Sequence, residues 1–238
     1  MPAYNEESRL PRTLERLANF LDSRQWAFQE IVVVDDGSRD GTADLVRSAA
    51  VRRPSLKLLQ NPGNKGKGYT VRHGMLEAKG EWVLYTDADL SSPIEEFDKL
   101  CRASEERDAV IAFGSRALEE SRVEVHQPWL REYSGRFFNL VMRSLTGLPF
   151  LDTQCGFKLF RRDAAQAVFS RQQLNGFGFD VEALFIARQL GLKAVEVPVR
   201  WADVEGTKVS LLRGVDGFVD LARIRKNQFE GKYRQIPG

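Results

Sequence analysis

Histidine and cysteine are scarce in this chain, whose 238 residues include only two of each. His73 and His126 lie far apart in the sequence, as do Cys101 and Cys155, so no Cys/His cluster indicates a zinc site. Two separated cysteines also argue against the disulfide framework of a small secreted protein. The cysteine usage therefore favours a reducing, cytosolic setting.

Long apolar runs and a strong net charge are missing as well. No stretch approaches the ~18 apolar residues that a membrane-spanning helix needs, so we expect any membrane contact to be peripheral or through a partner. The net charge of +2 is too small to indicate a nucleic-acid-binding protein. Basic residues nevertheless outnumber acidic ones by six to two in residues 131–162 and by seven to three in residues 207–238, which predicts basic surfaces in the second half.

Four common motifs fail when they are tested on this sequence. The glycines at Gly66 and Gly68 are followed by Val71 where a dinucleotide-binding loop has its third glycine, and no Gly-Lys-Ser/Thr of a phosphate-binding P-loop occurs there. A calcium loop starting at Asp36 would place Arg47 where a bidentate glutamate is required. No Gly-x-Ser-x-Gly segment of a serine hydrolase is present. These absences exclude the corresponding enzyme and sensor classes.

Short apolar runs alternate with amphipathic patterns, which predicts an α/β fold with a mostly parallel sheet covered by helices on both faces. The expected strands are residues 30–34, 57–60, 82–85, 109–113 and 194–200, and residues 152–160 are expected to be a loop that enters a further strand. The expected helices are residues 10–22, 43–50, 69–78, 93–106, 129–145, 178–190 and 211–229. The helix at 129–145 fits either a core-facing position or a membrane surface, because its apolar face carries aromatic residues and arginines surround it.

The expected strand at 82–85 ends in two carboxylates, Asp87 and Asp89, which are followed by a Ser-Ser-Pro turn. In open α/β sheets, ligands bind outside the carboxyl ends of the strands. Two neighbouring aspartates repel each other unless a cation lies between them, and hard oxygen ligands suit Mg²⁺ or Mn²⁺. We therefore expect a metal-bound diphosphate here, with a solvated turn as the simpler alternative.

Four segments together resemble the family 2 glycosyltransferases with the GT-A fold. They are Pro2-Ala3-Tyr4-Asn5-Glu6, Val34-Asp35-Asp36-Gly37-Ser38, Asn64-Lys65-Gly66-Lys67-Gly68 and Asp87-Ala88-Asp89. The later segments Asp152-Thr153-Gln154-Cys155-Gly156, Phe179-Asp180-Val181-Glu182 and Glu205-Gly206-Thr207-Lys208 are more similar to the dolichyl-phosphate glucosyltransferase branch than to its mannosyltransferase relatives. The resemblance implies one domain over residues 1–238, with a nucleotide-sugar-binding half (1–115) and an acceptor-binding half (116–238).

The resemblance also implies roles for individual residues. The nucleotide sugar is expected to contact Pro2, Ala3, Tyr4, Glu6, Asp36, Lys65, Lys67 and Asp87. The metal ion, Mg²⁺ or Mn²⁺, is expected at Asp87 and Asp89, of which Asp89 is the more direct ligand. The acceptor phosphate is expected at Arg116, Arg131 and Lys208, with Arg116 and Asp89 also counted among the catalytic residues.

Asp180 falls where related transferases carry the catalytic base. A phosphate acceptor is already ionised near neutral pH, because its second pKa is about 6, so it makes a base less necessary. Asp180 could then hold the sugar hydroxyls or the acceptor cations, with Glu182 nearby.

The implied reaction is metal-dependent transfer of glucose from UDP-glucose, with inversion, to dolichyl or polyprenyl phosphate at the cytoplasmic face of a membrane. The alternatives are a GDP-mannose donor, a hydroxyl acceptor, and a non-catalytic nucleotide-sugar-binding protein. The family pattern has an apolar strand before Pro2, so we expect either that the true start lies upstream, which we favour, or that the sheet lacks its first strand. Thr207 replaces the usual serine before Lys208 and keeps its hydroxyl group.

Overall fold

A computed structural model describes residues 1–125, 142–202 and 213–234. Along the chain, its elements are β1 (Pro2–Ala3), α1 (Leu10–Asp22), β2 (Ile31–Asp35), α2 (Thr42–Arg52), β3 (Leu56–Gln60), α3 (Lys67–Glu77), β4 (Trp82–Thr86), η1 (Ile94–Glu96), α4 (Phe97–Glu106), β5 (Ile111–Ser115), β6 (Arg122–Val125), β7 (Phe157–Arg161), α6 (Arg162–Phe169), α7 (Phe179–Gln189), β8 (Ala194–Pro198), β9 (Arg200–Ala202) and α8 (Arg213–Phe229). Within the described ranges, no helix has the length and apolar character needed to cross a membrane.

The strands form two main sheets. β1, β2 and β3 pair in parallel in that order, and the second sheet has the order β4-β7-β5-β8. β5 and β8 are parallel, whereas β7 runs antiparallel to both of its neighbours. The first strand, β1, has only two residues and pairs with β2. β1 and β4 each lie at the edge of their own sheet.

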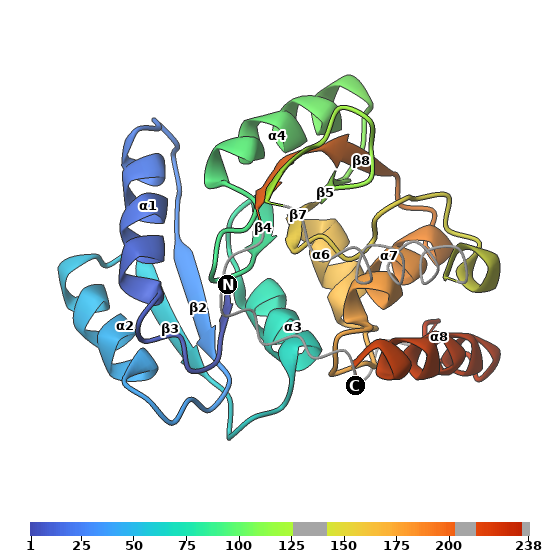
Figure 1. The fold of residues 1–238 in the computed structure, drawn as a ribbon, viewed down its shortest axis with the longest axis horizontal. Helices are drawn as coiled ribbons and strands as arrows, with labels where there is room; N and C mark the ends of the chain where they lie inside the picture. The colour runs from blue at the N-terminus through green and yellow to red at the C-terminus, as the bar shows by residue number, and fades with distance from the viewer. Residues whose placement is uncertain (126–141, 203–212, 235–238) are drawn as a thin grey trace.

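Helices cover the sheets as the α/β pattern predicts. In Figure 1, α1 and α2 lie beside the three-stranded sheet, α3 lies between the two sheets, and α6 and α7 lie beside the four-stranded sheet. α1 begins and ends at the predicted residues because its leucines recur at helical spacing, and Leu10, Leu14 and Leu17 are buried. Both sheets are therefore flanked by helices.

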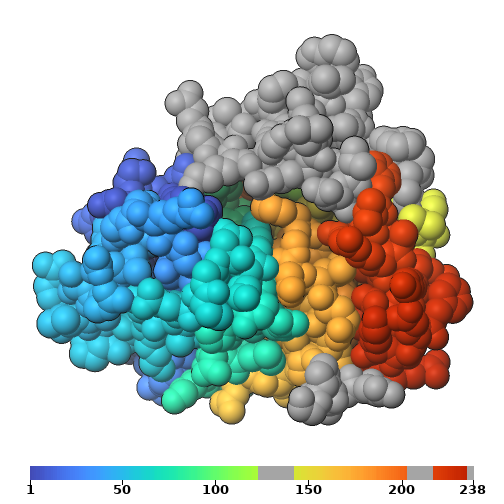
Figure 2. Space-filling model, turned by 90° about the horizontal axis from the view of Figure 1, so that it is seen from below, coloured from blue at the N-terminus to red at the C-terminus, as the bar shows by residue number. Residues whose placement is uncertain are grey.

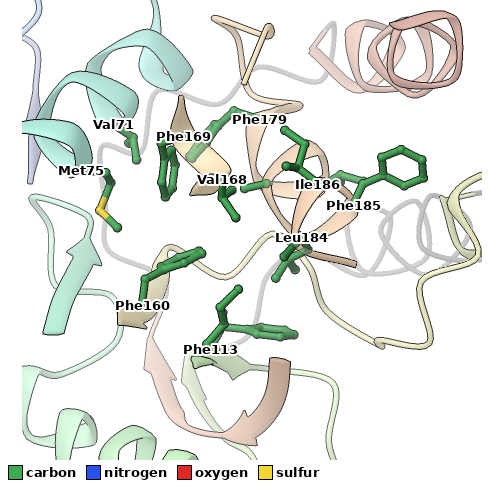
Figure 3. Packing of buried hydrophobic residues seen from close by; sticks show 14 of the residues in the cluster. Val71, Met75, Phe113, Phe160, Val168, Phe169, Phe179, Leu184, Phe185 and Ile186 are labelled. Carbon is green, nitrogen blue, oxygen red and sulfur yellow. The ribbon is translucent and has the colours of Figure 1, made fainter. Parts of the chain in front are cut away.

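The largest apolar cluster surrounds α7. All residues from Phe179 to Ala187 are buried, so this helix lies inside the molecule and not on its surface. Phe113 and Phe160 from the sheet and Phe169 from α6 belong to the same cluster (Figure 3). Charged side chains on such a helix need partners, because an unpaired buried charge is strongly destabilising.

Several elements differ from the sequence prediction. α6, β6 and β9 were not predicted, and the expected strand at 194–200 is divided between β8 and β9. α3 starts two residues early, which places Lys67 in its first turn. Most of the expected helix at 129–145 lies outside the described residues, although residues 142–146 are helical.

Candidate active site

Loops at the carboxyl ends of β1 and β2 are joined by short hydrogen bonds. The amide of Asn5 donates to Ser38 Oγ over 2.9 Å, and the amide of Glu6 donates to Thr42 Oγ1 over 2.8 Å. Asn5 adopts a φ of 53°, a left-handed conformation that asparagine tolerates better than most residues. The predicted nucleotide-binding segment at residues 2–6 is therefore fixed to the 35–42 loop by its backbone.

Asp36 joins the third loop, residues 61–66, to the same edge. Its buried carboxylate accepts hydrogen bonds from the amides of Lys65 and Gly66, both 2.9 Å long, and from Asn61 Nδ2 over 2.8 Å. The carboxylate thus shapes the loop from within the protein. Its predicted contact with the base or ribose remains a prediction.

Lys67 reaches the carboxylate pair from the first turn of α3. Its ammonium lies 2.8 Å from Asp87 Oδ1, and about a quarter of each side chain is exposed (24% and 27%). Burial lowers the pKa of Lys67, but the carboxylates of Asp87, Asp180 and Asp89 outweigh burial, so the net shift is upward. Lys65, in contrast, lies exposed at the loop surface.

Asp87 is held in one position by its surroundings. Tyr85 OH donates to Asp87 Oδ1 over 3.0 Å, and the amide of Asp87 donates to the carbonyl of Gly156 over 3.2 Å. A Cβ atom added at Gly156 would lie 2.0 Å from Asp87 Oδ2, so only glycine leaves room for the carboxylate. Residues from β4 and from the turn before β7 therefore fix this side chain together.

Asp89 lies on a strained turn directly after β4. Its Oδ1 accepts the amide of Ser91 over 2.9 Å, and Leu90 has a φ of 48°, an uncommon conformation for a large side chain. Thr13 Oγ1 of α1 donates to the carbonyl of Ala88 over 2.6 Å and anchors the turn from the other side.

The donor set of this turn fits a divalent cation that shares its ligands with a diphosphate. Mg²⁺ is usually bound by one or two carboxylates together with substrate phosphates and water. Asp87 and Asp89 supply two hard carboxylates, and the described residues contain no group of three or more His, Cys, Asp or Glu side chains suited to a metal ion. The remaining ligands would therefore come from the substrate and water.

Asp180 is paired with a lysine that the sequence analysis missed. Lys158 Nζ lies 2.5 Å from Asp180 Oδ1 and 2.5 Å from the carbonyl of Cys155, and both charged side chains are buried. Burial raises the pKa of Asp180, an effect that Lys158 and Lys67 partly offset. A lysine between the apolar residues Phe157 and Leu159 of β7 is the signal that could have revealed this pair.

Tyr85 lies between the two ion pairs. The ammonium groups of Lys67 and Lys158 are each 5.8 Å from the centre of its ring, within the range of a cation–π interaction. The result is a continuous polar cluster that runs from Lys67 through Asp87, Tyr85 and Lys158 to Asp180.

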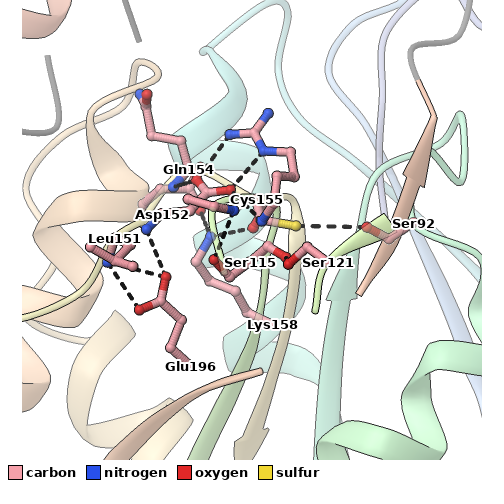
Figure 4. Close-up of polar contacts among 12 residues, drawn as sticks. Ser92, Ser115, Ser121, Leu151, Asp152, Gln154, Cys155, Lys158 and Glu196 are labelled. Carbon is pink, nitrogen blue, oxygen red and sulfur yellow. Dashed lines mark hydrogen bonds and ion pairs between the residues drawn. The ribbon is translucent and has the colours of Figure 1, made fainter. Parts of the chain in front are cut away.

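Arg116 is also engaged by a neighbour. Its Nε and Nη2 donate to Asp152 over 2.6 and 2.9 Å, and its amide donates to the same carboxylate over 3.0 Å. Burial disfavours the charged form of both groups, but the attraction and hydrogen bonds between Arg116 and Asp152 outweigh burial. The pKa of Arg116 is therefore raised and the pKa of Asp152 is lowered. Glu196 accepts the amide of Asp152 over 2.7 Å (Figure 4), so Arg116 is held by a supported carboxylate.

The two other predicted acceptor residues, Arg131 and Lys208, lie outside the described residues. Among the described residues, the structure brings Lys67, Asp87 and Asp180 into one cluster. Nothing in the sequence alone marked Tyr85 as a partner of Asp87 or Asp152 as the partner of Arg116.

Comparison with known proteins places this chain in a family. The sequence model "Glycosyl transferase family 2" matches residues 1–169. The chain belongs to the family 2 glycosyltransferases. The transferase is 38% identical over 234 residues to a dolichyl-phosphate beta-glucosyltransferase of Trichomonas vaginalis, covering 94% of this chain and 71% of the relative. It is 33% identical over 246 residues to the dolichyl-phosphate beta-glucosyltransferase of Homo sapiens, covering 98% and 76%.

Solved structures confirm the fold of this glycosyltransferase. Mannosyl-3-phosphoglycerate synthase from Rubrobacter xylanophilus aligns with a TM-score of 0.67, at 18% identity and with coverage of 100% of this chain and 75% of that chain. Glucosyl-3-phosphoglycerate synthase from Mycobacterium tuberculosis, in complex with Mn²⁺, UDP-glucose and phosphoglyceric acid, aligns with a TM-score of 0.66, at 18% identity and with coverage of 94% and 77%. At this identity the likeness supports the GT-A fold alone.

Proposed function

We propose that this glycosyltransferase moves glucose from UDP-glucose to dolichyl phosphate or a related polyprenyl phosphate, with inversion at the sugar carbon. The observation that carries the proposal is the likeness to dolichyl-phosphate beta-glucosyltransferases from protists and animals at 33–38% identity over 94–98% of this chain. UDP-glucose, the metal ion and contact with the cytoplasmic face of a membrane are parts of the same proposal.

The donor is proposed to bind across the three strand-end loops. The 2–6 and 35–42 loops hold the nucleoside, while Lys65 and Lys67 bind the diphosphate, because flexible cationic side chains beside glycines suit a close phosphate. Asp87 and Asp89 would hold Mg²⁺ or Mn²⁺, which when bound neutralises the charge of the leaving diphosphate. Both aspartates follow directly after β4 and so lie at the carboxyl end of that strand.

The state of Asp180 favours a phosphate acceptor over a hydroxyl acceptor. Its carboxylate is buried and already bonded to Lys158, so the protein uses it to fix a cation. An ionised phosphate attacks the sugar without losing a proton to a base. Arg116, steadied by Asp152, is proposed to hold that phosphate together with Arg131 and Lys208.

The test is transfer of labelled sugar to a short polyprenyl phosphate in detergent, with UDP-glucose and GDP-mannose offered in parallel and with Mg²⁺ or Mn²⁺ present. We expect lipid-linked β-glucose that disappears with EDTA and in Asp89→Ala. Asp98→Ala is the matched control, because it removes an exposed carboxylate of α4 that pairs only with Arg24 among the recorded ion pairs of the described residues.

Other products would correct individual parts of the proposal. Lipid-linked mannose would replace the donor and keep the acceptor. Transfer to a hydroxyl acceptor, with none to the lipid phosphate, would overturn the acceptor assignment. Binding of UDP with Mn²⁺ and no transfer from either donor would favour a binding protein.

A further inference from the structure

Glu182 is a fully buried carboxylate that the proposed reaction does not use. It lies on α7 two residues after Asp180 and has no solvent exposure. Its oxygens accept the amide of Gln173 at 3.1 and 3.2 Å, the amide of Leu174 at 2.8 Å and the hydroxyl of Tyr233 at 2.8 Å. Glu182 therefore joins α7, the segment before it and the turn after α8.

The segment that Glu182 holds also caps helix α3. The N-cap residue Gly66 supplies no side-chain bond, and the amides of Gly68 and Tyr69 donate to the carbonyl of Asn175 over 2.8 and 3.3 Å. Gln172 Nε2 donates to the carbonyl of Gly68 over 2.9 Å. The first amides of a helix lack partners within the helix, so this remote segment satisfies them.

Packing at this junction leaves little freedom. Gly66 has a φ of +100°, and a Cβ atom added there would lie 2.5 Å from the carbonyl oxygen of Asn175. A Cβ at Gly68 would lie 2.6 Å from the carbonyl oxygen of Leu174. Figure 2 shows the teal surface of α3 beside the orange surface of the part of the chain that contains α6 and α7, and α3 contacts α6.

The first turn of α3 carries Lys67, the lysine that contacts Asp87. The ring of Phe177, which directly follows residues 172–176, lies 5.7 Å from the Lys67 ammonium. The path from Glu182 to Lys67 thus runs through the amides of Gln173 and Leu174, along the backbone to the carbonyl of Asn175, and from there into the first turn of α3.

We propose that Glu182 and Tyr233 are positioning residues for the donor diphosphate, because they hold the segment at residues 172–176 that fixes the first turn of α3 and so the ammonium of Lys67. Tyr233, in the turn after α8, would in this way help to position Lys67 although it does not contact the diphosphate itself. The proposal rests on the proposed function only in its assumption that Lys67 meets a diphosphate.

The hydrogen bonds of Glu182 to Tyr233 and to the amides of residues 173 and 174 are called the brace below. Tyr233→Phe tests the brace with the smallest change. The variant loses one hydroxyl and keeps the ring, whose centre lies 6.0 Å from that of Phe185, so we expect it to fold. Glu182→Gln is the second variant. Ser104→Ala is the matched control, because it also removes a buried hydroxyl bond, to the carbonyl of Ala109, but on α4 away from this junction.

Hydrogen–deuterium exchange of the full chain measures the junction without any ligand. We expect the amides of residues 68–70 to exchange at least fivefold faster in Tyr233→Phe than in the wild type, with no change in Ser104→Ala. Unchanged exchange at these amides in both brace variants would overturn the proposal, whatever the donor is.

UDP titration in Mn²⁺ and donor kinetics give the second readout. We expect UDP binding to weaken about threefold to tenfold and KM for UDP-glucose to rise by the same factor, with kcat nearly unchanged. A fall in kcat alone, or a lower Tm with normal KM, would reduce Tyr233 to a structural role and overturn the proposal. Faster exchange in a protein whose wild type binds no UDP would support the brace and overturn the donor assignment.

Discussion

Lys67→Met separates two roles of one ammonium group, because it should change metal binding and nucleotide binding in opposite directions. In the ligand-free protein Lys67 neutralises Asp87, so an incoming cation competes with it for the carboxylate. At 2.8 Å and an effective dielectric constant of about 20, the charges attract by about 6 kcal/mol, most of which the desolvation of both groups offsets. A net value on the order of 1.4 kcal/mol corresponds to about tenfold in affinity.

Calorimetric titration measures both affinities on the same protein. Without nucleotide, Mn²⁺ should bind about tenfold tighter to Lys67→Met than to the wild type. With Mn²⁺ saturating, UDP should bind at least tenfold more weakly, because a charge-assisted contact to the diphosphate is lost. Methionine keeps an unbranched side chain that is only one atom shorter, so packing is nearly preserved.

Lys65→Met is the matched control, since Lys65 lies only two residues before Lys67, in the 61–66 loop, and is exposed. Lys65→Met should lower the affinity for UDP. It should leave the affinity for Mn²⁺, measured without nucleotide, unchanged. If Mn²⁺ without nucleotide binds Lys67→Met with the wild-type affinity or more weakly, then Lys67 does not compete at Asp87 and the reasoning is refuted.

Three further predictions concern neighbouring groups. Gly156→Ala should cut transfer by at least a hundredfold at a modest cost in Tm, because a Cβ there would lie 2.0 Å from Asp87 Oδ2; near-normal kinetics would contradict this. Asp180→Asn should lower Tm, because Lys158 loses its buried partner, yet keep measurable transfer to a phosphate acceptor; complete loss in a folded variant would indicate a base. Burial raises the pKa of Glu182 from 4.5 to about 7, so its contribution to stability is full below pH 4.5 and is lost as the pH rises through about 7. The free energy of unfolding of the wild type, measured relative to Glu182→Gln between pH 4.5 and 8, should therefore fall by roughly 3 kcal/mol, and a constant difference would argue against this assignment.

The sequence predicted those parts of the fold that local patterns determine. The spacing of apolar residues located α1 at its observed bounds, and the apolar run before Asp87 located β4 within one residue. The antiparallel strand β7 was recognised as a strand, but its place between β4 and β5 depends on pairing between residues far apart in the sequence, such as Thr86 and Phe157. Local periodicity contains no information about such a partner.

The same limit applies to the site. The residue types at Asp87, Asp89 and Asp180 are visible in the sequence, and the resemblance to a family assigns them roles. Their partners are not visible, because Lys158 reaches Asp180 across 22 residues and Tyr233 reaches Glu182 across 51. A buried charge implies that a partner exists, and only the fold shows which residue it is.

The pairing within the site bears on the acceptor. Among the described residues, Lys67 pairs with Asp87, Lys158 with Asp180 and Arg116 with Asp152, so the three carboxylates each hold a cation in place. A hydroxyl acceptor would require one of them to give up its cation and take a proton, at the cost of leaving a buried lysine or arginine unpaired. A phosphate acceptor requires no such exchange, because it arrives ionised and meets cations that are already oriented. The paired state of the site therefore favours an anionic acceptor on physical grounds, independently of the names of its relatives.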